Sequence, residues 1–189
     1  MYQKYQTEAL VLGSREQGES DRVFALYTKD FGLVRARASA VRKESSRMRY
    51  ALQHYSHAQV ALVRGKRGWR LGGATMLGDR MSLEGAVTFA RTARLVLRLV
   101  AGEEQNDYLF AALSEARSAL SKSSQETFPT IEIVCVARIL FALGYLSSEA
   151  LQTTLFAHAA YAERDLVEAA ALREKLLSSI NRAITESHL

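Results

Sequence analysis

One short stretch of the chain places an aromatic ring among four positive charges. It has the sequence Arg64-Gly65-Lys66-Arg67-Gly68-Trp69-Arg70, and it contains the only tryptophan of the protein. Basic side chains bind phosphates, and an exposed indole stacks on a base, so the pattern predicts contact with single-stranded nucleic acid. The alternative is that Trp69 closes the end of a hydrophobic core, because tryptophan is usually well buried.

More basic residues lie upstream of this stretch. Residues 33–41 alternate between small apolar side chains and the polar side chains of Arg35, Arg37 and Ser39, which indicates a strand with one basic face. The polar segment 42–49 that follows has no periodicity, so we expect a mobile basic loop. The complete predicted nucleic-acid site consists of Arg15, Arg22, Arg35, Arg37, Arg42, Lys43, Arg47, Arg49, Arg64, Lys66, Arg67, Trp69 and Arg70.

The charge of the chain is divided unevenly along its 189 residues. The first 80 residues contain 15 Lys and Arg against 7 Asp and Glu, whereas the remainder contains 10 against 13. Clustered positive charge raises the local potential and attracts polyanions, which favours a nucleic-acid partner for the first part. A basic surface that is merely solvated is the alternative.

No group of residues in the sequence is typical of an enzyme. The chain has no phosphate-binding Gly-x-x-x-x-Gly-Lys-Ser loop, no Gly-x-Ser-x-Gly turn and no His-Glu-x-x-His helix. Its one cysteine, Cys135, lies in an apolar segment and is expected in the core. We therefore predict no catalytic residue and no cofactor. A metal-dependent nuclease is the least favoured interpretation.

The acidic residues near the first turn are the remaining candidates for a metal site. Glu16, Glu19 and Asp21 could hold a cation such as magnesium, but arginines are interleaved with them, which favours charge pairing across the turn. His54 and His57 are three residues apart in an expected strand and so face opposite sides. We predict no bound metal.

The first 80 residues must form short strands to hold these cations on a surface. Alternation with period two, interrupted by glycine turns, predicts strands at residues 7–14, 22–28, 33–41, 56–64 and 69–74. Small residues in the third strand, from Val34 to Ala40, suit the crowded interior of a barrel. The expected domain, residues 1–80, is a five-stranded OB-like β-barrel that binds single strands on its open face.

Beyond residue 81 the apolar spacing becomes helical. We expect helices from Ser82 to about Val100, and at 106–120, 131–146, 149–155 and 161–187. The third of these is apolar on nearly every side and is expected to be the central buried helix. The predicted fold is α+β, an N-terminal five-stranded OB-like barrel followed by an α-helical domain, residues 81–189.

A stripe of arginines in the helical part suggests a surface for a partner. Arg91, Arg94 and Arg98 share one face of the first helix, and Arg138 is the only cation of the central helix. We predict that Arg91, Arg94 and Arg98 bind an anionic partner. The alternative is a solvated face, or pairing with Glu103 and Glu104 nearby.

The N-terminal sequence and the length of the apolar stretches indicate where in the cell the protein is expected. The sequence begins without an apolar leader segment, and no stretch approaches the roughly 18 apolar residues of a membrane span. We expect a cytoplasmic, nucleoid-associated protein with no membrane contact.

Particular residues resemble a known family, the RecO recombination mediators. The resemblance is dense in Tyr5-Gln6-Thr7-Glu8-Ala9-Leu10-Val11-Leu12, Gly18-Glu19-Ser20-Asp21-Arg22 and Leu26-Tyr27-Thr28. Ala51-Leu52-Gln53, Val63-Arg64-Gly65-Lys66 and Trp69-Arg70-Leu71 are similar to later strands of the family's barrel, and Leu143-Gly144-Tyr145 to its central helix.

The resemblance implies a function and a set of partners. Members of the family bind and anneal DNA strands, displace single-stranded-DNA-binding protein and assist RecA loading, with RecR as partner. Their helical domain is thought to receive the acidic C-terminal tail of single-stranded-DNA-binding protein, which implies a site for the tail at Arg91, Arg94, Arg98 and Arg138 here. Many members carry a four-cysteine zinc element after the Leu-Gly-Tyr residues, but here that region has no cysteine. An RNA-binding OB module is the alternative that we keep open.

Overall fold

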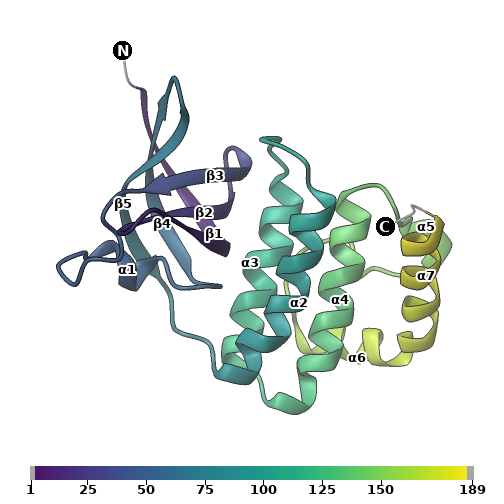
Figure 1. Ribbon diagram of the computed structural model, residues 1–189. Helices are drawn as coiled ribbons and strands as arrows, with labels where there is room; N and C mark the ends of the chain where they lie inside the picture. The colour runs from purple at the N-terminus through teal and green to yellow at the C-terminus, as the bar shows by residue number, and fades with distance from the viewer. Residues whose placement is uncertain (1–2, 187–189) are drawn as a thin grey trace. The chain divides into compact units, whose positions relative to one another are not determined.

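The structure is a computed structural model that describes residues 3–186 of the chain (Figure 1). It divides into two compact units. One extends to Arg80 and also includes Val100–Asp107, and the other comprises Met81–Leu99 and the chain from Tyr108 onward.

Five strands form a closed barrel in the first unit. They are β1 (Gln3–Gln17), β2 (Asp21–Thr28), β3 (Gly32–Ala38), β4 (His57–Gly65) and β5 (Gly68–Leu77). Their order around the barrel is β1-β2-β3-β5-β4, with β3 and β5 parallel and the other described pairs antiparallel. The predicted α+β fold with an OB-like barrel is confirmed.

β1 is longer than predicted because it closes the barrel. Its residues from Ala9 to Gln17 pair with β2, and those from Gln3 to Leu10 pair with β4. The register shifts between Val11 and Gly13, where the pairing with β2 is irregular. A bulge of this kind bends a strand, so that one end of β1 can pair with β4 and the other end with β2.

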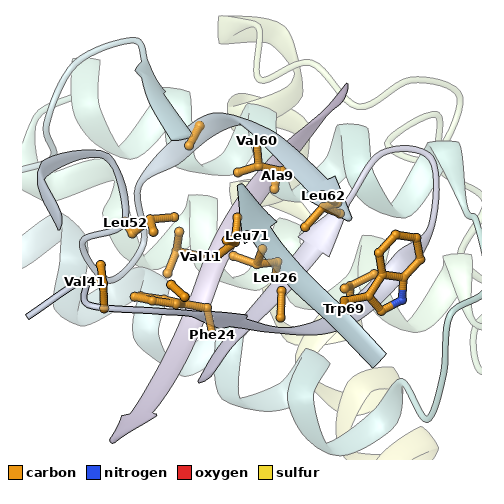
Figure 2. Close-up of a cluster of buried hydrophobic side chains, with 14 residues drawn as sticks. Ala9, Val11, Phe24, Leu26, Val41, Leu52, Val60, Leu62, Trp69 and Leu71 are labelled. Carbon is orange, nitrogen blue, oxygen red and sulfur yellow. The ribbon is translucent and has the colours of Figure 1, made fainter. Parts of the chain in front are cut away.

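Small side chains of β3 fill the barrel, as predicted. Val34, Ala36 and Ala38 are fully buried, whereas Arg35 and Arg37 are exposed. Ala40 lies beyond the strand, with φ of 53°. Figure 2 shows the core, with Trp69 at one end of the cluster and Val41 and Leu52 at the other.

The connection between β3 and β4 contains a helical turn where the sequence predicts only a loop. Helix α1 (Met48–Ala51) begins within the segment predicted to be a loop. Ala51 and Leu52 are buried by it, and Leu52 enters the barrel core. The resemblance had placed these two residues in a strand, and that assignment is wrong.

The second unit is helical. Its elements are α2 (Leu83–Leu99), α3 (Asp107–Lys122), a 3-10 turn (Gln125–Thr127), α4 (Phe128–Ala142), α5 (Ser148–Leu151), α6 (Glu163–Ala171) and α7 (Arg173–Glu186). Helix α4 contacts α2, α6 and α7, so the predicted central position of this helix is confirmed. The long last helix was predicted wrongly: it is divided at Leu172, and its expected end at residue 187 lies outside the described residues.

Residues 100–107 connect α2 with α3, yet they pack on the barrel. The amide of Leu33 donates to the carbonyl oxygen of Gly102 at 3.3 Å. Gly32, with φ of +63°, lies so close that a β-carbon there would be 2.1 Å from the carbonyl oxygen of Glu104. Only glycine fits this position. Between residues 3 and 186 no helix is long and apolar enough to cross a membrane.

Candidate nucleic-acid interface

The strand register aligns basic residues across the outer face of the barrel. Arg15 of β1 lies opposite Val23 of β2, Val23 opposite Arg37 of β3, and Arg37 opposite Arg70 of β5. Paired residues of neighbouring strands share a face, and strands lie about 4.8 Å apart, so this row extends over roughly 14 Å.

The row forms the floor of a groove with a volume of about 750 Å³. The β4–β5 hairpin borders it with Lys66 and Arg67. The residues that line the groove are Arg15, Gln17, Val23, Arg35, Arg37, Ser39, Gly65, Lys66, Arg67, Gly68, Trp69 and Arg70. Six of them are cationic and none is acidic. Gln17 and Ser39 are not among the predicted site residues, although Gln17 lies two residues after Arg15 on β1 and Ser39 lies two residues after Arg37, just beyond β3.

Acidic residues neutralise some of the predicted cations. Arg37 donates to one carboxylate oxygen of Asp21 at 2.6 and 2.9 Å, and the other accepts from the amide of Ala40 at 2.8 Å. The Ala40 amide and then Arg37 lower the pKa of Asp21. Glu16 contacts Arg22 at 3.3 Å and Arg42 at 3.2 Å. The predicted pairing across the turn is thus seen for Glu16 with Arg22, whereas Asp21 pairs with Arg37 of β3.

Five groove cations keep their charge uncompensated. Within the described part of the chain, no ion pair with an acidic side chain involves Arg15, Arg35, Lys66, Arg67 or Arg70. These residues are exposed. The groove is consequently a strongly positive surface that is open to a polyanion.

Trp69 does not offer its ring to a base. Its exposed fraction is 4%, and its ring packs against Phe31 and Tyr5, with centroid separations of 5.1 and 5.6 Å. The guanidinium of Arg64 lies 4.9 Å from the ring centroid, and Arg64 also pairs with Glu103 at 2.7 Å. The prediction that Trp69 stacks on a base is therefore wrong, and Trp69 closes the core, as in the alternative interpretation.

The remaining predicted cations of the barrel unit lie elsewhere. Arg22, Arg42 and Arg49 line a separate pocket of about 260 Å³. Lys43 and Arg47 are exposed on the connection between β3 and β4. Of the thirteen predicted residues, the groove thus brings together Arg15, Arg35, Arg37, Lys66, Arg67, Trp69 and Arg70.

The four arginines predicted to bind a partner in the helical unit differ in their exposure and in their contacts. Arg94 and Arg98 are exposed, but Arg91 forms a two-point ion pair with Glu132, at 2.5 and 2.6 Å. Arg138 is completely buried and donates to three backbone carbonyls. The prediction that Arg138 contacts a partner is wrong, because its guanidinium is not accessible.

The described residues contain no group of three or more His, Cys, Asp and Glu side chains that could hold a metal ion. Cys135 is buried, as expected, and burial raises the pKa of its thiol to about 12. The thiol is therefore protonated at neutral pH and is a poor nucleophile.

Fold and groove together define the class: an OB-like barrel with a cationic outer face, joined to a helical unit. Residues 1–73 match the family described as recombination protein O N terminal. The chain thus belongs to the RecO family, and its barrel corresponds to the family's N-terminal domain.

Similarity to individual relatives continues into the helical part. The DNA repair protein RecO of Heliobacterium modesticaldum is 35% identical over 147 residues, which cover 75% of this chain and 52% of the relative. That of Pelotomaculum thermopropionicum is 31% identical over 140 residues, or 72% and 55%. That of Desulfitobacterium hafniense is 44% identical over 62 residues, or 33% and 23%. The chain therefore spans at most about half the length of these relatives.

Proposed function

We propose that the protein binds single-stranded DNA in the basic groove and acts in recombinational repair as a non-enzymatic mediator. One observation carries the proposal: six cations and no acidic residue line a groove on the outer face of an OB-like barrel. Barrels of this class bind single strands through positively charged grooves that follow the backbone. The relatives named as DNA repair proteins support the same setting.

The composition of the groove suits strand annealing. The one aromatic residue among its lining residues is Trp69, which is buried. Contacts therefore go to phosphates and not to base faces, so they are independent of sequence and leave the bases free to pair. The phosphates of double-stranded DNA can use the same charges. We infer that the protein anneals complementary strands and thereby assists RecA loading, close to the nucleoid in the cytoplasm.

A strand-annealing assay tests this function. We expect the protein to accelerate pairing of complementary DNA oligomers, both free and covered by single-stranded-DNA-binding protein. Matched RNA oligomers serve as competitors. If RNA displaces DNA from the protein, the RNA-binding OB module becomes the better description, and if neither is bound at low salt, the groove is not a nucleic-acid site.

The proposal also covers protein partners, namely RecR, RecA indirectly, and the C-terminal tail of single-stranded-DNA-binding protein. With Arg138 buried, an acidic tail with apolar end residues would need another surface. Helix α2 offers exposed Leu83 and Val87, followed by Arg94 and Arg98. A labelled tail peptide titrated at moderate salt should bind this helix. A dissociation constant of about 100 μM corresponds to a binding free energy of roughly 5.5 kcal/mol. If no binding is seen at that concentration, this partner is ruled out.

A further inference from the structure

A second pocket of the barrel lies on the other side of β2 from the groove. Val23 faces the groove, whereas its neighbours Arg22 and Phe24 line this pocket, because successive side chains of a strand point to opposite faces. The same alternation on β1 turns Arg15 and Gln17 to the groove and Glu16 to Arg22, its partner in the strand register. One β-hairpin thus separates the two sites.

The pocket combines a cationic rim with an apolar floor. Its volume is about 260 Å³, and the side chains of Arg22, Arg42 and Arg49 share it with three apolar residues, Phe24, Val41 and Leu52. The apolar residues are 2–3% exposed. Figure 2 shows them at the end of the core away from Trp69.

A single carboxylate bridges two of these arginines. Glu16 places one oxygen 3.3 Å from Arg22 and the other 3.2 Å from Arg42, and its side chain is 57% exposed. Arg49 donates to the hydroxyl of Tyr50 at 2.7 Å and has no acidic partner among the described residues. The Nε of Arg22 is buried without an acceptor. Three guanidinium groups therefore share one negative charge.

The contacts of Glu16 with two arginines are of the kind that a phosphate also makes. Like a carboxylate, a phosphate accepts from two guanidinium groups at once, and it presents more oxygens to additional donors. Exposed ion pairs such as those of Glu16 contribute only about 0–1 kcal/mol, so their exchange for a phosphate costs little.

We propose that this pocket is a second phosphate subsite, in which a phosphodiester group of the bound strand replaces the Glu16 carboxylate between Arg22 and Arg42. Arg49 provides the third guanidinium. A strand that lies in the groove reaches the subsite by passing the β1–β2 turn. The inference rests on the proposed function and extends it, since Glu16 then sets how tightly the strand is held.

The variant Glu16→Gln tests the subsite. Removing the carboxylate leaves both arginines free for a phosphate, so binding of an oligo-dT strand should tighten about three- to tenfold. The plot of log K against log salt should steepen by about 0.7, the value for one added phosphate contact. Adding Arg42→Gln in the same chain should abolish the gain.

Glu103→Gln is the matched control. It removes one negative charge from the same unit and frees Arg64, which lines neither the groove nor the pocket. Equal gains from both variants would reveal a general charge effect and overturn the subsite, as would no gain for Glu16→Gln. Unchanged tryptophan fluorescence shows that the barrel remains folded.

Inorganic phosphate separates this inference from the proposed function. In a calorimetric titration it should bind the Glu16→Gln protein and not the Glu16→Gln/Arg42→Gln protein. If the parent fails to bind DNA, the proposed function is lost, and the phosphate titration alone decides the pocket. If phosphate does not bind the Glu16→Gln protein, while this protein and the parent bind DNA equally well, only the subsite is overturned.

Discussion

At the scale of the residue, Arg138 shows how one buried side chain organises an irregular segment. Its guanidinium donates to the carbonyl oxygens of Leu155, Ala159 and Ala160 at 2.7–2.9 Å and lies 4.6 Å from the ring centroid of Tyr161. Buried charge is tolerated when every donor is matched. The segment between α5 and α6 is thus fastened to α4, in the region where the resemblance implies a zinc element in other members.

Arg138→Met should therefore destabilise the helical unit by about 3 kcal/mol or more, because three carbonyls lose a charged donor and hydrogen bonds of this kind contribute roughly 1.5–3 kcal/mol each. Urea unfolding followed by far-ultraviolet circular dichroism measures the loss. Trp69, the only tryptophan, reports the barrel separately. Arg182→Met on the exposed surface of α7 is the control, and an equal effect there would contradict this role of Arg138.

The positions of the groove cations could be predicted from alternation, but which of them an acidic side chain neutralises could not. Arg35 and Arg37 are equivalent in the sequence pattern, yet only Arg37 meets Asp21. That pair depends on the register of β2 against β3 and on the turn that brings the Ala40 amide to the same carboxylate. The burial of Trp69 and of Arg138 likewise depends on neighbours that are distant in sequence.

At the scale of the element, periodicity predicted which strands and helices exist better than where they end. Alternation locates β3, whose interior face is made of small residues. It does not reveal that β1 continues to Gln17, because those outer residues are polar and are held by pairing with β2. The break at Leu172 was missed because α6 and α7 are both amphipathic and no glycine or proline separates them.

Gly32 connects β3 with the segment 100–107, and its replacement tests that packing. Gly32→Ala should destabilise the barrel by about 1–2 kcal/mol for the left-handed backbone and by roughly 1–3 kcal/mol more for the clash with Glu104. Gly18→Ala is the matched control, because Gly18 has a similar φ of +68° but open space around it. Urea unfolding followed by tryptophan fluorescence compares the two variants. If their midpoints are equal, the segment 100–107 contributes little to the stability of the barrel.

At the scale of the whole molecule, the uneven distribution of charge becomes a concentrated surface. The fold brings six of the fifteen Lys and Arg residues in the first 80 positions together in one groove that has no acidic lining residue. Composition alone predicted a polyanion partner. Composition does not show which cations lie together, because this depends on how the barrel closes. β3 and β5 are far apart in sequence and become neighbours through two paired positions.

Binding to single-stranded DNA should consequently weaken steeply with salt. With about four to six phosphates neutralised, log K against log salt should have a slope of roughly −3 to −4, and Arg35→Gln with Arg70→Gln should reduce its magnitude by about 1.4. Arg37→Gln should change it less, because Asp21 already holds that guanidinium. The same two substitutions at Arg94 and Arg98 serve as control, and an affinity that is insensitive to salt would contradict the phosphate model.

The barrel unit is not one continuous piece of chain, since Val100–Asp107 belongs to it although α2 intervenes. During synthesis at about 5–20 residues per second, the strands leave the ribosome some seconds before this last piece emerges. Leu33 and Gly32 therefore lack their contacts with Gly102 and Glu104 until that piece has emerged. A gene fragment that ends at residue 80 would encode every strand and still lack the piece that covers β3, so the barrel is not a freely exchangeable module.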